Sequence, residues 1–157
     1  MTTLLNEKQI HKIEKIVHDW EFFQSFSEDE LEDAIHQFSL RRIAVDEVIF
    51  GEHDSGDYLF LILEGKVEIS LHSHSNNKII AVLEEGAIAG EMSMLDDYSR
   101  SATAKAIEDT EILILTKNKL HQVLADNPPL GVKFLAQLGR TVSLRLRSMV
   151  GNLAEIS

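Results

Sequence analysis

The stretch Lys-Val-Glu-Ile-Ser-Leu-His at residues 66–72 alternates polar and apolar side chains without a break. Such alternation is what a β-strand with one buried face requires. Other short apolar runs, each bounded by turn residues, lie at 48–50, 59–63, 79–83 and 112–115. Many short strands at close spacing are typical of an antiparallel sandwich or roll, so we expect a mainly β domain.

Helical patterns flank these strands on both sides. A regular apolar spacing from Ile10 to Val17 and a capping box of the form S-x-x-E at Ser27 predict two helices before them. After them, Thr116 is expected to cap a helix that ends at Asn127, where two prolines follow and a final helix begins. We therefore predict a single domain over 1–157, with N-terminal helices at 1–38, a β-roll at 39–116 and C-terminal helices at 117–157.

The charge balance and composition exclude several classes of protein. The 157-residue chain carries 15 Lys and Arg against 26 Asp and Glu, so its formal net charge is −11. A field of this sign repels phosphates and disfavours broad binding of DNA or RNA. The chain has no cysteine, which excludes disulfides and thiolate metal sites. No apolar run approaches the roughly 18 residues of a membrane-spanning helix, so we expect a cytoplasmic protein that does not bind a membrane. Because of its negative charge, we also expect that it does not bind nucleic acid.

Residues 86–104 interrupt the strand pattern with glycines, a short helical turn and an arginine. They read Gly-Ala-Ile-Ala-Gly-Glu-Met-Ser-Met-Leu-Asp-Asp-Tyr-Ser-Arg-Ser-Ala-Thr-Ala. The N–H groups at the start of a helix and an arginine fork together suit one phosphate, and Glu91 can accept a hydrogen bond from a sugar hydroxyl. The alternative is that Arg100 is a surface residue that neutralises Asp96 and Asp97. Spacing alone leaves both interpretations open.

This segment resembles the phosphate-binding cassette of the cyclic nucleotide-binding domain family. The pattern of that family is close to F-G-E-x-A-L, three or four further residues, and then R-[SAT]-A. A second block, residues 48–67, resembles the V-I-F-x-x-G-D-x-G-D-x-F-Y-I-I-x-x-G-x-V of the same family. The two blocks come in the family order, and the resemblance runs from about Trp20 to the final helix. It implies an antiparallel jelly-roll barrel, or double-stranded β-helix, that carries a short cassette helix.

The resemblance also implies a ligand and its site. The ligand would be cAMP or cGMP, bound for regulation and without a metal, with Glu91 on the ribose 2′-OH and Arg100 on the cyclic phosphate. The other expected ligand-binding residues are Gly90, Met92, Ser101 and Ala102. Serine directly after the cassette arginine occurs in the bacterial cAMP regulators, so cAMP is favoured over cGMP. No hydrolytic motif is present, and we expect a sensor that is not an enzyme.

The final helix is expected to act as a lid and as a dimer seam. The resemblance places three of its residues near enough to cover the base, namely Arg140, Thr141 and Arg145. Its apolar stripe has roughly heptad spacing and suits a homodimer, through Leu135, Leu138, Val142 and Met149. The stripe can equally pack on the chain's own roll. If the chain is complete, a protein partner is expected to receive the signal.

Two other interpretations stay open. A ligand-independent interaction module would keep the fold and dimerise without a nucleotide. A metal-binding protein of the cupin type would use His72 and His74, which share one face of a strand, although the glutamate that a cupin needs does not follow them. A solvated hairpin is the favoured interpretation of this pair. The chain also departs from the family at Ala89, where a large apolar residue is usual, and at Asp46 and His53, where glycine is common.

Overall fold

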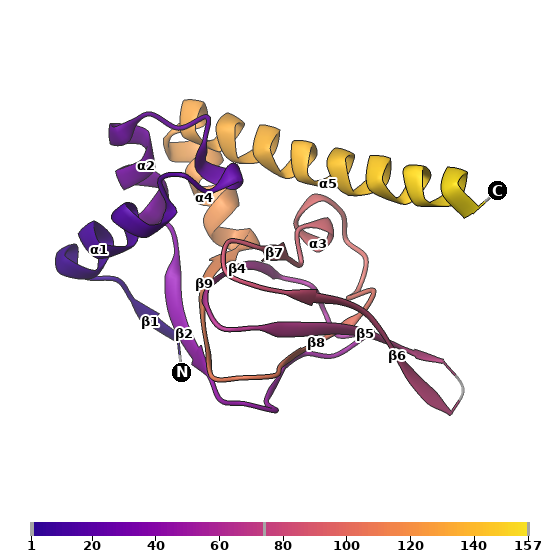
Figure 1. Cartoon of the computed structure of the whole chain (residues 1–157). Helices are drawn as coiled ribbons and strands as arrows, with labels where there is room; N and C mark the ends of the chain where they lie inside the picture. Colours follow the sequence, from indigo (N-terminus) through magenta and orange to yellow (C-terminus); the bar gives the residue numbers. More distant parts are fainter. Residues whose placement is uncertain (1, 74, 157) are drawn as a thin grey trace.

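The strands form two antiparallel sheets that close over a common core. The computed structural model describes residues 2–73 and 75–156. One sheet has the order β1 (Thr2–Leu4), β2 (Ser39–Ile43), β9 (Thr110–Thr116), β4 (Tyr58–Glu64) and β7 (Ile88–Ala89). The other has the order β3 (Val48–Phe50), β8 (Thr103–Ala106), β5 (Val67–Ser73) and β6 (Asn76–Leu83). The predicted mainly β class with flanking helices is confirmed, and Figure 1 shows the helices gathered on one side of the barrel.

Strand β4 lies at the centre of the core and is covered on both faces. Phe60 and Ile62 pack inside the barrel with Val67, whereas Leu59 and Leu61 pack beneath the helices. Successive side chains of a strand point to opposite faces, so a strand that is covered on both must be apolar throughout. This explains why β4 reads as an unbroken apolar run while β5, which is covered less completely, alternates.

The two N-terminal helices begin with the same capping arrangement. Asn6 accepts a hydrogen bond from the backbone of Gln9 while the Gln9 side chain bonds back, and Ser27 and Glu30 do the same. Each box satisfies two backbone donors that a helix end otherwise leaves free. The two predicted helices are confirmed, with the bounds Glu7–Val17 for α1 and Glu28–Ile35 for α2.

A cluster of aromatic rings joins these helices to the C-terminal part of the chain. It includes the short 3-10 helix η1 (Glu21–Phe23), and neighbouring ring centroids lie 5.1 to 6.3 Å apart. All six of these pairs are tilted or edge-on, the arrangement that the ring quadrupole favours. The members are Phe22, Phe23, Phe26, Phe38 and Phe134.

The C-terminal helices are α4 (Lys117–Asp126) and α5 (Pro128–Ile156). Thr116 caps α4 as predicted, because its side chain accepts from the Lys119 N–H at 3.1 Å. The first half of α5 buries Phe134 and Leu138 in the chain's own core, whereas its side chains from 143 to 152 are exposed. Figure 1 shows α5 as a long rod that passes above the short helix α3 (Met92–Leu95). Within the described ranges, no helix combines the length and apolar character needed to cross a bilayer.

Two features of the strand region differ from the sequence pattern or extend it. Strands β1 and β2 were not predicted, because β1 is three residues long and β2 contains two arginines where alternation would require apolar residues. Asp46 and His53 adopt φ of 70° and 75°, so these two residues do occupy positions that usually need glycine. The division of the domain at residues 38 and 116 stays a prediction.

Candidate functional site

A cavity of about 400 Å³ lies between α3, the exposed half of α5 and the sheet of β3, β8, β5 and β6. Most of its wall is apolar, and two oppositely charged residues of the predicted cassette belong to it. The lining residues are Phe50, Ile69, Ile80, Ala81, Leu83, Ala89, Gly90, Glu91, Met92, Ser93, Arg100, Ser101, Ala102, Arg145, Ser148 and Met149.

Arg100 is the buried cation of this cavity, with only 2% of the residue exposed. Its guanidinium donates to the backbone oxygen of Gly90 at 3.3 Å and to that of Tyr58 at 2.5 Å, and its Cζ lies 4.0 Å from the centroid of the Phe50 ring. None of the ion pairs found in residues 2–73 and 75–156 involves Arg100. Burial lowers the pKa of Arg100, because the cation loses water without gaining a bonded carboxylate.

Two glycines make room for this arginine and for α3. Gly90 has a φ of 82°, and a Cβ there would lie 2.6 Å from Arg100 Nη1 and 3.0 Å from the Tyr58 oxygen. A Cβ at Gly56 would lie 2.1 Å from Ser93 Oγ, which is far inside van der Waals contact. A larger residue at either position would therefore displace the guanidinium or the cassette helix.

Glu91 is the buried anion at the start of α3, with 1% of the residue exposed. Its Oε1 accepts a hydrogen bond from Nη1 of Arg145, and Nη2 of Arg145 donates to the carbonyl oxygen of Ile88 in β7. One side chain of α5 thus reaches both the cassette helix and the neighbouring strand. Because α5 is otherwise exposed here, this contact is a principal link between the second half of α5 and the barrel.

Two polar atoms of the cavity have no hydrogen-bond partner. Among the described residues, the buried side-chain atoms of this kind are Glu14 Oε1, Glu91 Oε2 and Arg100 Nε. The two in the cavity are an acceptor and a charged donor, and a buried polar group without a partner costs about 1–3 kcal/mol, or more when it is charged. The cavity therefore suits a molecule that donates a hydroxyl group and carries an anion.

The structure brings most of the predicted site residues together. All six residues expected to bind ligand line the cavity, and Arg145 lines it with them. Arg140 and Thr141 do not, and instead line a separate cavity of about 210 Å³ beside Phe22. Thr141 lies four residues before Arg145, which is about 6 Å along the helix axis. That distance moves it away from the cassette and towards η1.

Other lining residues were missed by sequence reasoning. Ile69 and Ile80 come from β5 and β6, and the short motifs of the cassette do not point to them. Ser148 and Met149 follow Arg145 by three and four positions on α5, which places them on the same helix face. That spacing is the signal in the sequence that indicates them once Arg145 is assigned to the cavity.

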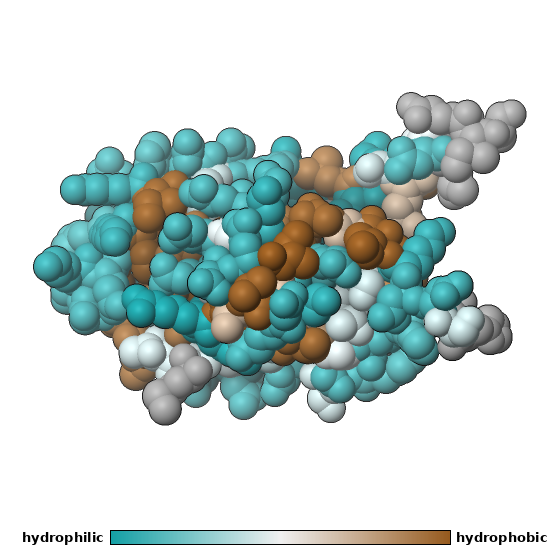
Figure 2. Space-filling model, turned by 60° about the horizontal axis from the view of Figure 1, so that its bottom comes forward, coloured by the Kyte–Doolittle hydropathy of each residue, from teal (hydrophilic) through white to brown (hydrophobic). Residues whose placement is uncertain are grey.

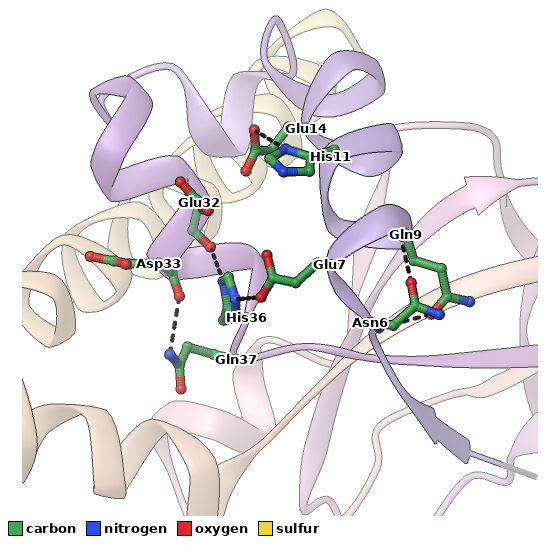
Figure 3. Close-up of polar contacts among 9 residues, drawn as sticks. All are labelled: Asn6, Glu7, Gln9, His11, Glu14, Glu32, Asp33, His36 and Gln37. Atoms are coloured by element: carbon green, nitrogen blue, oxygen red, sulfur yellow. Dashed lines mark hydrogen bonds and ion pairs between the residues drawn. The ribbon is translucent and has the colours of Figure 1, made fainter.

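None of the histidines that the structure describes lines this cavity. His72 Nδ1 lies 2.6 Å from Asn77 Oδ1, and His74, on which the metal interpretation also depended, lies outside the described residues. His36 lies between α1 and α2, where its ring contacts the Glu32 carbonyl oxygen and the Glu7 carboxylate (Figure 3). In the part of the chain that the structure describes, no three His, Asp or Glu side chains gather as a metal ion would require.

Comparison with known families bears directly on this site. The family model described as the cyclic nucleotide-binding domain matches residues 40–127, which include most of β2, the cassette and α4. The chain belongs to the cyclic nucleotide-binding domain family. The predicted family is confirmed, and members of it are regulatory sensor domains for cyclic nucleotides.

Individual relatives agree with this assignment. The Cyclic AMP receptor protein of Thermus thermophilus is 33% identical over 119 residues, covering 75% of this chain and 55% of the relative. A CRP-like cAMP-activated global transcriptional regulator of Mycobacterium tuberculosis is 28% identical, covering 69% of this chain and 47% of the relative. The solved cyclic nucleotide-binding domain from Methylobacillus flagellatus is 32% identical with a TM-score of 0.82, covering 96% of this chain and 85% of that one. The cyclic nucleotide-binding domain described here thus spans about half the length of its two sequence relatives.

Proposed function

We propose that this domain senses cAMP in preference to cGMP and that ligand binding sets the position of α5. The observation that carries the proposal is the pair of buried atoms without partners, Arg100 Nε and Glu91 Oε2. A 3′,5′-cyclic nucleotide has one anionic phosphate and one free ribose hydroxyl, so a single molecule satisfies both atoms. The proposed role is regulatory binding, without a metal and without enzyme activity.

The phosphate is assigned to Arg100. A buried cation that lacks a bonded carboxylate is costly, and an anion that enters the cavity removes this cost. The phosphate then lies at the start of β8, next to Ser101 and Ala102 in the cavity wall. The Ser101 hydroxyl and the backbone around Gly90 and Ala102 are the proposed additional contacts.

The ribose is assigned to Glu91. Arg145 occupies Oε1 of this carboxylate, while Oε2 is buried and has no partner. A 2′-hydroxyl that donates to Oε2 would complete the hydrogen bonding of the carboxylate without displacing Arg145. Hydrogen bonds to a charged acceptor are worth about 1.5–3 kcal/mol, so this contact should separate ribonucleotides from 2′-deoxy analogues.

The base is assigned to the apolar part of the wall. Ile69, Ile80 and Met149 offer the flat apolar contact that a purine needs, and Met92 lies at the cassette side with half of its surface exposed. The preference for cAMP rests on Ser101, since serine directly follows the cassette arginine here. This preference is smaller than the phosphate and ribose contributions, because a serine hydroxyl can also reach a guanine.

The proposed coupling to α5 depends on Arg145, Ser148 and Met149, which belong to the cavity wall. A ligand bonded to Glu91 is connected through that carboxylate to Arg145, and so to the exposed half of α5. Arg140 and Thr141, although expected in the lid, face the second cavity and are not assigned to it. Arg145→Ala should therefore uncouple α5 from the ligand, and amide exchange along residues 143–152 should become insensitive to cAMP. Unchanged protection by cAMP in this variant would contradict the coupling.

The proposed homodimer uses the apolar side chains that α5 leaves exposed. Leu138 of the predicted stripe is buried in the chain's own core, whereas Leu146, Met149 and Val150 are more than half exposed. Exposed apolar residues also occur on edge strand β6, at Ile79, Ile80 and Val82. Figure 2 shows several groups of apolar side chains on one face of the molecule. Exposed apolar residues that gather on one face are typical of an interaction site.

Light scattering tests the dimer. Leu146→Glu places a charge on the exposed surface of α5 and should yield a monomer, because a charge is costly in an apolar interface. Leu4→Glu is the matched control. Leu4 is 83% exposed and lies on β1, an edge strand of the five-stranded sheet, whereas β6 is an edge strand of the four-stranded sheet. A monomeric wild type would remove the dimer from the proposal.

Isothermal titration with cAMP and cGMP, before and after chelation, tests the ligand. We expect one cAMP per chain, weaker binding of cGMP and no effect of the chelator. A preference for cGMP of about tenfold would overturn the assignment of the base. Binding that is lost on chelation would favour a metal site. Binding of neither nucleotide would favour the ligand-independent interaction module.

A further inference from the structure

Lys117, the first residue of α4, contacts the C-terminal end of the cassette helix and is not among the residues that line the cavity. Its Nζ donates to the carbonyl oxygen of Ser93 at 3.2 Å, to that of Asp96 at 2.7 Å and to Asp97 Oδ1 at 3.0 Å. Its side chain is 21% exposed. The backbone N–H of Lys117 donates to the oxygen of Asp57 at 2.8 Å, which fixes the position from which the side chain reaches out.

A cation suits this end of α3. The last carbonyl groups of a helix have no donor within the helix and carry a partial negative charge. Helix α3 has only four residues, Met92–Leu95, and a helix this short has little stability of its own. Its geometry therefore depends on the groups that bond its two ends.

Both ends of α3 are bonded by the same pair of helices. Arg145 of α5 bonds Glu91 at the start of α3, and Lys117 of α4 bonds the carbonyl groups at its end. Helices α4 and α5 pack closely, since a Cβ at Gly131 would lie 2.6 Å from a Leu124 methyl group. Figure 1 shows α3 beneath α5, with α4 at the adjoining side of the barrel.

We propose that Lys117 is a positioning residue for the nucleotide site, an inference that rests on the function proposed above. It fixes the end of α3 and, with it, Ser93, which packs against Gly56; a Cβ at Gly56 would also lie 3.5 Å from Arg100 Cδ. Without Lys117, α3 frays from its carbonyl end, and the spacing between Glu91 and Arg100 is no longer held. Lys117 is not part of the cavity wall, so it acts on the ligand through α3 alone.

Titration of cAMP into the whole protein, with three variants, tests this role. Lys117→Met should weaken cAMP binding about three- to thirtyfold, the range expected for residues that act through a contact network. Lys117→Arg keeps the cation and should restore most of the affinity. Lys119→Met is the matched control, because it makes the same charge change on α4 but faces the groove beside α2. Wild-type affinity in Lys117→Met, or an equal loss in Lys119→Met, would overturn the proposal.

Amide exchange of residues 92–96 in the ligand-free protein separates positioning from general stability. Lys117→Met should accelerate exchange at Met94 and Asp96, whose N–H groups close the turns of α3, and leave the core strands unchanged. A lower melting temperature with unchanged exchange and affinity would show a purely structural role and overturn the proposal. If Lys117→Met does not fold, Lys117→Gln takes its place with the same two criteria. Since this measurement needs no ligand, it also distinguishes failure of the Lys117 role from failure of the proposed function.

Discussion

Two groups of charged residues in this domain are built from similar parts and lie in opposite surroundings. Arg100 and Glu91 are almost fully buried beside the cavity. His36 and Glu7 pair at the surface between α1 and α2, with side chains 37% and 71% exposed (Figure 3). Within the described residues, the buried group contains two buried polar atoms without a hydrogen-bond partner, Glu91 Oε2 and Arg100 Nε.

The difference shows what exclusion of water does to a charge. At the surface, water supplies the missing hydrogen bonds, and an exposed pair contributes at most about 1 kcal/mol. Arg100 and Glu91 are almost fully buried, so water screens their charges far less, and an unpaired buried ion costs several kcal/mol. We therefore expect the buried group to control ligand binding and the surface group only to adjust stability. The predictions below test this division.

The largest effect is expected for Arg100→Ala. Truncation of one partner of a buried charge pair costs roughly 2–5 kcal/mol, so cAMP affinity should fall by thirtyfold to several thousandfold. The measurement is isothermal titration of the folded variant. An unchanged dissociation constant would show that the anion binds elsewhere.

Arg42→Ala is the control for this prediction. Arg42 has an 82% exposed side chain and pairs with Glu111 at 3.3 Å, so the same substitution removes a surface cation. Its cAMP affinity should match the wild type. If both variants lost affinity equally, the net charge of the protein would be the cause, and the contrast between buried and exposed cations would disappear.

The next effect is expected for Glu91→Gln, in combination with 2′-deoxy-cAMP. The variant should bind cAMP more weakly by about 1.5–3 kcal/mol, because the ribose hydroxyl loses a charged acceptor. The wild type should bind the deoxy ligand with a similar loss, and the variant should discriminate less between the two ligands. Full discrimination in Glu91→Gln would mean that another group contacts the ribose.

The smallest effect is expected at His36, as a dependence of stability on pH. Its Nδ1 donates to the Glu32 carbonyl oxygen at 2.8 Å, so Nε2, at 3.2 Å from Glu7 Oε1, is the nitrogen that titrates. These contacts raise the pKa of His36 above its ordinary value of 6.5. The protonated form therefore stabilises the folded state at pH values below about 6.5, and this contribution disappears as the pH rises through the folded-state pKa.

Urea unfolding of wild type and His36→Gln measures this contribution. Because the pair is exposed, the difference in unfolding free energy should be below about 1 kcal/mol at pH 5.5 and smaller still at pH 8.5. Affinity for cAMP should be equal in both proteins at each pH. If the difference in unfolding free energy between wild type and His36→Gln were larger at pH 8.5 than at pH 5.5, the folded state would favour neutral His36, contrary to this prediction.

The sequence predicted those parts of the fold whose local pattern and burial agree. The alternation at 66–72 became β5, and the capping box at Ser27 began α2, because both patterns depend on neighbouring residues only. Strand β2 was not predicted, because Arg41 and Arg42 interrupt its apolar pattern. Its pairing with β1 and β9 depends on residues that are distant in the sequence. A strand that is formed mainly by pairing with distant strands has only a weak pattern in its own sequence.

The same contrast applies to the site. Arg100 and Glu91 were predicted because the cassette motif is continuous in the sequence. Which residues of α5 reach the cavity was harder to predict, since the register along a helix cannot be read without knowing how far α5 extends past the barrel. The lid itself stays a prediction. Ser148 and Met149 line the cavity, whereas Arg140 lies more than one turn too early.

The position of the chain's single tryptophan has a practical consequence. Its indole lies over the turn at Gly86, where a Cβ would be 3.6 Å from the ring. Two residues later in the same segment, the carbonyl oxygen of Ile88 accepts a hydrogen bond from Arg145. Trp20 fluorescence therefore reports on one place, the segment from Gly86 to Ile88, which Arg145 of α5 contacts. The protein carries its own optical reporter there, and no dye needs to be attached to follow that segment in solution.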